Sequence, residues 1–268
     1  MQREMDAAAA DIEKSLLPPT DVPTLRRIPT HGYNVSWLSK QLSILERLGS
    51  HGEDDGRDVW RHGQVSGTVY HGGEDLNKLL LETLERFLLT NPLHPDVFPG
   101  VRKMEAEVVS MVLNMYRAPS DAAGTTTSGG TESIMMACLA MRAWGRAVRG
   151  IRRPEIVIPA SAHVAFDKAG YYFSMVVRRI PVDRTTRKVR LDLMQRAINA
   201  NTVLLVGSAP NFPDGIIDDI VGIASLAKYH GIGCHVDCCL GSFLMPFLDR
   251  AGFVSCLLYT SDAADDTP

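Results

Sequence analysis

The sequence predicts an α/β protein in which a mainly parallel β-sheet is layered by helices. From Gly129 onward, segments with helical spacing of apolar residues alternate with short apolar segments, and the connections between them are short. One of these short segments, Val203–Val206, is apolar throughout, which is typical of strands covered on both faces. Parallel strands joined through helices are almost always connected by right-handed crossovers. We therefore expect a right-handed parallel sheet between layers of helices.

The chain divides into four predicted parts. They are an N-terminal arm over residues 1–65, a helical segment with a long loop over residues 66–127, an α/β domain over residues 128–255, and a tail over residues 256–268. The arm is polar and interrupted by prolines, whereas the α/β domain carries the alternating pattern. The tail breaks that pattern abruptly. We expect it to be a non-native segment translated from a sequencing adapter, with a natural acidic terminus as the alternative.

Three helices are expected before the alternating region. A helical pattern covers Ser36–Leu48, and leucines at helical spacing continue over Leu76–Leu88. The second of these helices ends before Asn91-Pro92, because the residue before a proline avoids the helical region. A third helix is predicted over Val101–Arg117, with its apolar side chains on one face and Pro119 after its end.

The alternating region contains four predicted helices and four predicted strands. Helices are expected at Thr131–Val148, His163–Phe173, Asp192–Asn199 and Asp218–His230, with the first of them opening the region, and strands at Glu155–Pro159, Met175–Ile180, Thr202–Ser208 and Ile232–Asp237. The helix at Asp192–Asn199 is expected to use Asp192 as its N-cap, with Gln195 three residues later as in a capping box.

Composition limits the class of protein. The chain has 268 residues, enough for a substantial core, and its 45% hydrophobic and 22% charged residues are ordinary for a globular protein. A net charge of −3 argues against a nucleic-acid partner. No apolar run is long enough to span a bilayer, and the first residues lack the apolar core of a secretory signal. The five cysteines form no disulfide framework, so we expect a reducing, cytoplasmic compartment for this chain.

A glycine-containing segment, Ser128–Ser133, opens the first helix of the α/β domain. Gly129 and Gly130 allow the backbone to approach an anion closely, and a helix N-terminus offers unpaired N–H groups to a phosphate. The hydroxyl of Thr131 adds a further donor. The alternative interpretation is an ordinary helix start with Ser128 or Thr131 as N-cap.

Two further residues lie where a parallel sheet places ligands, beyond the carboxyl ends of its strands. Asp237 ends an apolar strand, and a carboxylate there can keep a pyridine nitrogen protonated. His163 follows another strand, and its imidazole can stack on a planar cofactor and contact a substrate. The alternatives are a strand-end aspartate that caps a turn and a histidine that caps a helix. A phosphate site near one carboxylate suits pyridoxal phosphate.

Two other clusters favour simpler interpretations. Cysteines and histidines gather between His230 and Cys239, but they lack the spacing of a metal site, so we predict none. Arginines recur at helical spacing from Arg142 to Arg153. They are interpreted as a solvated helix end that complements the helix dipole, with a surface for anionic lipid as the alternative.

Over about residues 6–253, the chain resembles the sphingosine-1-phosphate lyase family, pyridoxal-phosphate enzymes related to the group II amino-acid decarboxylases. Blocks shared with the wider superfamily are Ser128–Ser133, Ser161–His163 with Lys168-Ala169, and His235–Asp237; blocks specific to the lyases are Ser66–Tyr70, Asn91–Gly100 and Ser208–Gly215. The resemblance implies a fold-type I large domain that is incomplete at its C-terminus, with pyridoxal 5′-phosphate as cofactor.

The resemblance also implies roles for individual residues. Cofactor binding would fall to Gly129, Gly130, Thr131, His163, Ser208 and Asp237, and substrate binding to Tyr70, Asn91 and His94. His163 would stack on the cofactor ring and is one candidate for the catalytic base. The Asn91–Gly100 block would lie on the substrate side, although a rigid proline loop is its simpler interpretation.

The implied reaction is cleavage of a phosphorylated long-chain base to a long-chain aldehyde and phosphoethanolamine. The family anchors its cofactor on a lysine in a Thr-His-Lys context, and none of the seven lysines in this sequence has that context. We therefore expect this chain to be a truncated fragment that is inactive alone. The resemblance further implies a homodimer, and for a full-length eukaryotic form the cytosolic face of the endoplasmic reticulum. An amino-acid decarboxylase of the same fold and a non-catalytic cofactor-binding fragment remain alternatives.

Overall fold

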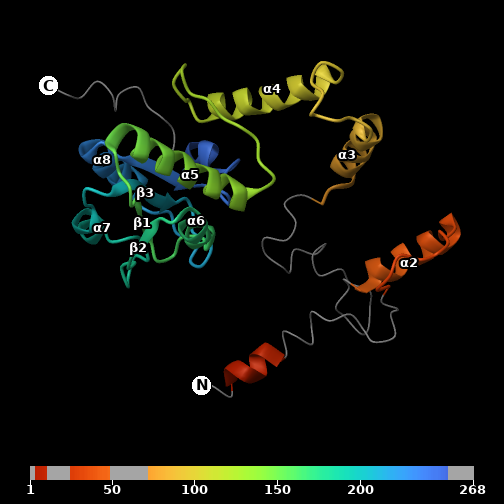
Figure 1. Ribbon diagram of the computed structural model, residues 1–268, viewed down its shortest axis with the longest axis horizontal. Coiled ribbons are helices and arrows are strands. Elements are labelled where there is room, and N and C mark those ends of the chain that lie inside the picture. Colours follow the sequence, from red (N-terminus) through yellow and green to blue (C-terminus); the bar gives the residue numbers. More distant parts are fainter. Residues whose placement is uncertain (1–3, 11–24, 49–71, 253–268) are drawn as a thin grey trace. The chain divides into compact units, whose positions relative to one another are not determined.

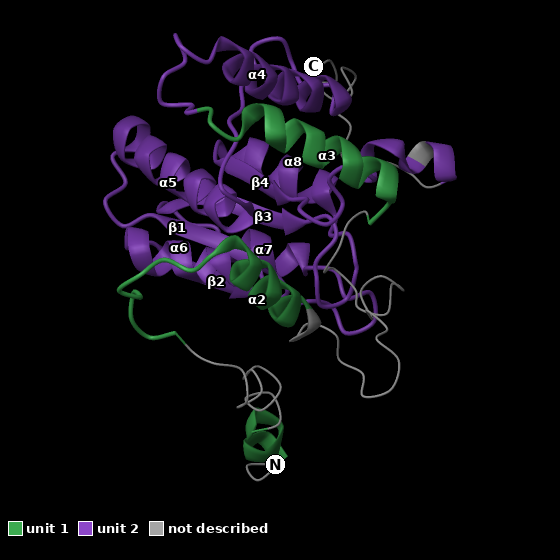
Figure 2. Cartoon of the chain, turned by 90° about the vertical axis from the view of Figure 1, so that its right-hand side faces the viewer, with its two compact units in different colours: residues 1–90 green, residues 91–268 purple. Residues whose placement is uncertain are grey.

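A computed structural model describes residues 4–10, 25–48 and 72–252, and the chain divides between Thr90 and Asn91 into two compact units (Figures 1 and 2). The first unit contains a helix at residues 4–10, α2 (Val35–Leu48) and α3 (Glu74–Phe87). Both α2 and α3 confirm the helices predicted from apolar spacing. The predicted tail lies outside the described residues.

The second unit contains a four-stranded parallel sheet, as the sequence predicts. Its strands are β1 (Glu155–Pro159), β2 (Val176–Ile180), β3 (Thr202–Ser208) and β4 (Gly233–Asp237). Their order in the sheet is β2-β1-β3-β4, and every neighbouring pair is parallel. After β1, the chain adds β2 on one side of it, and then adds β3 and β4 on the other side. The crevice between the ends of β1 and β3 is therefore the point where the strand order reverses, which is where open α/β sheets bind ligands.

Helices cover both faces of this sheet (Figure 1). In chain order the second unit has α4 (Pro99–Met115), α5 (Gly130–Arg149), α6 (Ala165–Phe173), α7 (Leu191–Ala197), α8 (Ile220–His230) and the 3₁₀ helix η1 (Met245–Ala251). On one face, α5 and α6 bury Cys138 and Phe166 against the sheet. On the other face, α7 and α8 bury Met194 and Ile223. The α/β layered fold predicted from the sequence is confirmed.

Helix α5 lies close to the sheet and runs against the direction of the strands. Near its C-terminal end, a side chain at Gly145 would begin 2.5 Å from Cγ1 of Val203 at the start of β3. In the middle of α5, Met141 Cε lies 2.5 Å from the place where a side chain at Gly233, the start of β4, would begin. The N-terminus of α5 is consequently at the carboxyl ends of these strands.

The start of α7 differs from the prediction. Arg190, and not Asp192, is the N-cap of this helix, and its backbone oxygen accepts hydrogen bonds from Leu193 and Met194. The carboxylate of Asp192 is held instead by two hydrogen bonds of 2.8 Å from the Arg190 guanidinium. A charge-assisted bidentate contact is stronger than a cap to a backbone N–H, which explains why the predicted capping box is wrong.

Helix α8 also begins later than predicted. Asp219 is its N-cap, and its side chain accepts a hydrogen bond of 2.9 Å from the backbone N–H of Gly222. Asp218, the predicted first residue, is buried in front of the helix. The helix predicted from His163 begins at Ala165, because His163 contacts the helix start from outside it.

Candidate functional site

The N-terminus of α5 has free backbone donors. Gly129 is its N-cap and makes no side-chain cap bond, so neither Ser128 nor Thr131 holds that position. The backbone N–H of Ser133 bonds to the Gly129 oxygen at 3.0 Å, but within residues 72–252 the N–H groups of Gly130 and Thr131 have no acceptor. Unpaired amides at a helix start are an anion-binding arrangement.

One acidic side chain stands in the first turn of α5, and it is turned back toward the preceding loop. Glu132 accepts hydrogen bonds from the backbone N–H and the hydroxyl of Ser128, both at 2.6 Å. The hydroxyl and N–H of Ser128 hold the pKa of the Glu132 carboxyl below its usual value. The carboxylate is thus occupied by Ser128, and the amides of Gly130 and Thr131 remain available.

The end of β4 lies beside this helix start. Cys239 Sγ is 3.5 Å from the point where a side chain at Gly130 would begin. The backbone N–H of Cys239 also donates a 3.2 Å hydrogen bond to Oδ1 of Asp237, which fixes one oxygen of that carboxylate. Two segments more than a hundred residues apart in sequence, the start of α5 and the end of β4, are therefore in contact.

Ser208 and Asp237 are direct neighbours across the sheet. They are register partners at the carboxyl ends of β3 and β4, and the Ala209 N–H bonds to the Asp237 backbone oxygen at 2.8 Å. Ser208 is buried and Asp237 is partly buried. The structure thus brings Gly130, Ser208 and Asp237 to one edge of the sheet.

His163 lies beyond the end of β1, on the same edge, and is exposed. Its Nδ1 accepts a 3.0 Å hydrogen bond from the backbone N–H of Ala165 at the start of α6. The alternative interpretation of His163 as a helix cap is therefore partly correct, because its ring accepts a backbone N–H at the start of α6. In the neutral imidazole the proton must then be on Nε2, which is left to face outward as a donor.

A buried carboxylate that sequence reasoning missed supports the end of β3. Asp218 accepts hydrogen bonds from the backbone N–H groups of Ser208 at 3.0 Å and Val189 at 2.8 Å. Burial raises the pKa of the Asp218 carboxyl, while those two N–H groups and Lys188 act in the opposite direction. The signal in the sequence is the pair Asp218-Asp219 before α8. Because only one of the two can be the N-cap, the other is free to accept other hydrogen bonds.

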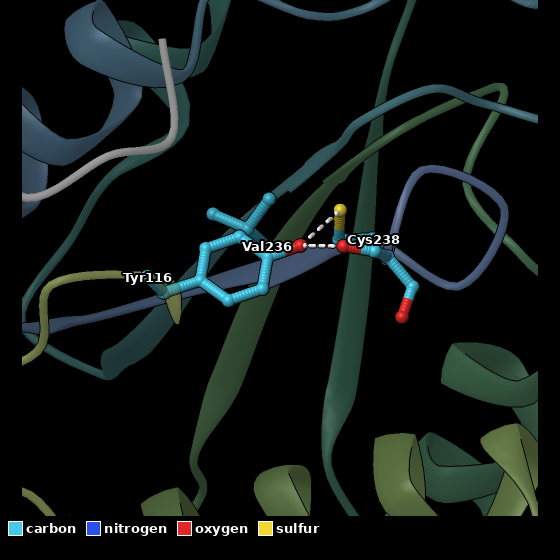
Figure 3. Close-up of a pocket in the computed structure, with 4 residues that line it drawn as sticks. Tyr116, Val236 and Cys238 are labelled. Carbon is cyan, nitrogen blue, oxygen red and sulfur yellow. Dashed lines mark hydrogen bonds between the residues drawn. The ribbon is translucent and has the colours of Figure 1, made fainter. Parts of the chain in front are cut away.

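A second missed feature is an open pocket of about 340 Å³ on the other side of β4, lined by Tyr116, Val236, Cys238 and Ser242 (Figure 3). The Tyr116 hydroxyl, just after α4, donates to the Ser242 backbone oxygen and lies 3.5 Å from Cys238 Sγ. Burial raises the pKa of Tyr116, with a further contribution from Cys238. This contact fastens the end of α4 to the loop after β4.

The predicted substrate residues are not gathered at this edge by any contact in the described chain. Asn91 and His94 form a turn of their own, in which Asn91 Oδ1 accepts from the Leu93 N–H at 3.1 Å and the Asn91 oxygen accepts from the His94 N–H at 3.0 Å. Tyr70 lies outside the described residues. The roles of these three residues stay predictions.

The described part of the chain meets neither the requirements of a metal site nor those of a membrane-spanning helix. Among residues 4–10, 25–48 and 72–252, no three histidine, cysteine or acidic side chains are grouped so that they could hold a metal ion. No helix in that part of the chain is long and apolar enough to cross a bilayer.

Comparison with known proteins identifies the family. Residues 58–255 match the model of the pyridoxal-dependent decarboxylase conserved domain. The chain belongs to this family. The match includes every residue of the α5 helix start and of strands β1 to β4, so the family's conserved domain contains the edge described above.

Within this broad family, curated relatives that match the chain over most of its length include sphingosine-1-phosphate lyases. The chain is 46% identical over 255 residues to sphingosine-1-phosphate lyase of Saccharomyces cerevisiae, covering 94% of this chain and 42% of that protein. It is 50% identical over 216 residues to sphingosine-1-phosphate lyase of Drosophila melanogaster, covering 81% of this chain and 39% of the other. The chain therefore spans about two fifths of the length of these relatives.

Solved structures agree with the fold. The sphingosine-1-phosphate lyase of Burkholderia pseudomallei is 35% identical with a TM-score of 0.80, covering 89% of this chain and 55% of that one. A glutamate decarboxylase of Lactobacillus brevis, at 20% identity and a TM-score of 0.66, covers 86% of this chain and 53% of the other. At that identity the decarboxylase supports the fold alone.

Proposed function

We propose that this chain is part of a pyridoxal-phosphate-dependent carbon–carbon lyase that cleaves phosphorylated long-chain bases to a long-chain aldehyde and phosphoethanolamine. The observation that carries the proposal is the 46% identity to a sphingosine-1-phosphate lyase over nearly the whole chain. The lyase-specific blocks of the sequence support it, and so does the meeting of the α5 amides with Asp237.

The residues at the sheet edge fit the cofactor. The unpaired N–H groups of Gly130 and Thr131 match a phosphate, and a side chain at Gly130 would begin in contact with Cys239, 3.5 Å from its Sγ. Asp237, with one oxygen held by the Cys239 N–H, keeps its other oxygen for a protonated ring nitrogen. Gly129 and Ser208 complete the proposed cofactor residues. Bound pyridoxal phosphate supplies an electron sink for the pair left by the broken bond.

His163 is assigned a proton-donating role at this edge. Because its Nδ1 already accepts the Ala165 N–H, its neutral ring presents Nε2–H to the solvent side. That nitrogen can donate to a cofactor or substrate oxygen. Nε2 can act as a base only in the other tautomer, in which Nδ1 carries the proton and can no longer accept the Ala165 N–H. The geometry therefore favours His163 as a stacking and donor residue over the predicted catalytic base.

Tyr70, Asn91 and His94 are proposed to bind the phosphate of the substrate. The support is the lyase-specific sequence of the Ser66–Tyr70 and Asn91–Gly100 blocks. A homodimer is proposed as well, supported by exposed leucines along one helix, since Leu79, Leu80 and Leu84 of α3 are each more than half exposed. The endoplasmic-reticulum location of a full-length form rests on the family resemblance and stays a prediction.

The test uses the complete coding sequence of the locus, expressed with its cofactor. Sphingosine 1-phosphate should yield a long-chain aldehyde and phosphoethanolamine, and amino acids should yield no carbon dioxide. Release of carbon dioxide without aldehyde would favour the alternative, an amino-acid decarboxylase. For the chain as given, which we propose to be inactive alone, the measurement is binding of pyridoxamine 5′-phosphate, an analogue that needs no lysine bond.

A further inference from the structure

His235 lies on β4 beside Asp237, the carboxylate proposed to bind the cofactor ring nitrogen. It is two residues before Asp237 in β4, so both side chains project from the same face of the strand. The His235 ring packs edge-on against Phe166 of α6, with ring centres 5.7 Å apart and planes at 70°. Phe166 is fully buried in the core between the sheet and α5 and α6. Both His235 and Asp237 therefore face the layer that contains the α5 helix start.

The surroundings of His235 favour a neutral ring. Burial lowers the pKa of its imidazole, and the negative charge of Asp237 opposes that shift. Its register partner in β3 is Val206, and its neighbour on α6 is Phe166, neither of which titrates. From α5 the same core contains Cys138, and burial raises the pKa of that thiol to about 11, so it stays neutral where an imidazole titrates. Among the described residues, Asp237 is the charged group that acts on His235.

We propose that His235 is a positioning residue that, while neutral, leaves the charge of Asp237 to the cofactor ring nitrogen, and that protonation of His235 competes with this nitrogen for the same carboxylate. The inference rests on the proposed function, since it assigns a partner to Asp237. Such competition makes cofactor binding at Asp237 weaker at acid pH, where His235 is protonated. By reciprocity, a cation held by Asp237 must make His235 harder to protonate to the same degree that protonated His235 weakens the cation.

The first experiment follows the His235 imidazole by NMR in the histidine-labelled chain. Saturating pyridoxamine 5′-phosphate should move the titration midpoint of His235 to lower pH, and so should Asp237→Asn, because each removes negative charge available to the ring. Two charges two residues apart on one face of a strand, in a partly buried site, interact strongly enough for a shift of about one pH unit. An unshifted midpoint in the saturated chain overturns the inference, and this result does not depend on any His235 variant folding.

The second experiment compares dissociation constants of pyridoxamine 5′-phosphate one pH unit above and one below that midpoint. On acidification the wild-type chain should lose about fivefold more affinity than His235→Gln, because glutamine cannot become charged. His230→Gln, at the end of α8, is the matched control and should behave like the wild type. An equal loss in His235→Gln and wild type overturns the inference while leaving the proposed function intact. If the analogue binds at neither pH, the proposed cofactor site itself fails.

Discussion

Cys239 Sγ and the Cα of Gly130 approach so closely that a methyl group at Gly130 would sit 3.5 Å from the sulfur. This distance is ordinary van der Waals contact, so the fold itself tolerates a small side chain there. However, the new methyl group would lie beside the unpaired amides of Gly130 and Thr131 at the start of α5. A substitution at Gly130 should therefore affect anion binding without affecting folding.

Gly130→Ala should weaken binding of pyridoxamine 5′-phosphate by about tenfold while leaving the free energy of unfolding within about 1 kcal/mol of wild type. The methyl group narrows the approach of a phosphate to the Gly130 and Thr131 amides. Titration calorimetry and urea unfolding measure the two quantities. Gly100→Ala, at the start of α4 with nothing within 4 Å of the new methyl group, is the control. Equal binding by Gly130→Ala and wild type would remove Gly130 from the site.

A second close approach concerns the core. At Gly145, the same substitution places a methyl group 2.5 Å from Val203 Cγ1. The overlap should cost about 1–3 kcal/mol, of which the higher helix propensity of alanine returns up to about 1 kcal/mol. Gly145→Ala should therefore unfold at lower urea than wild type. In a double-mutant cycle, Val203→Ala should relieve the overlap and give a coupling of about 1 kcal/mol or more; additive effects would mean that α5 does not press on β3 at this point.

The sequence predicted the layered fold because its signals are local and strong. Strand β3 is apolar throughout and was predicted with the bounds Thr202–Ser208 that the structure shows. Asp237 and His163 were placed at the carboxyl edge because Asp237 ends one strand and His163 follows another. The contact of Cys239 with Gly130 could not be predicted, because it depends on how α5 crosses the sheet. Likewise, the choice between Asp218 and Asp219 as N-cap of α8 depends on the backbone of Val189, which only the fold brings near.

Asp218 should make stability depend on pH in an unusual direction. Its carboxyl has a raised pKa in the folded chain, so the folded state keeps the proton that the unfolded state loses near pH 4. The unfolding free energy should therefore fall as the pH rises from that unfolded value to the folded pKa, and be level above it. Asp218→Asn should abolish this contribution. Urea unfolding from pH 4 to pH 8 measures it, and identical profiles of variant and wild type would contradict it.

Glu155, at the amino-terminal end of β1, should change stability with pH in the opposite direction. Its carboxylate accepts from two nitrogens of Arg178 in β2 and from Asn199 Nδ2 at 2.7 Å, and it is itself buried. The Arg178 guanidinium, against the effect of burial, holds the pKa of the Glu155 carboxyl below its usual value. The stabilisation is therefore present above the unfolded value near pH 4.3 and is lost as the pH falls through the lower folded pKa.

Glu155→Gln should lower the unfolding free energy at pH 7 by about 1–2 kcal/mol, because charge-assisted hydrogen bonds to a buried oxygen are replaced by weaker ones. The deficit should shrink at acid pH, where the wild-type carboxyl is protonated as well. Glu82→Gln is the matched control, since Glu82 pairs with Arg86 on the exposed surface of α3 and both side chains are more than half exposed. That control should change stability by less than about 0.5 kcal/mol. A Glu155→Gln deficit that stays constant down to the acid end of the range would show that packing, and not charge, holds β2 to β1.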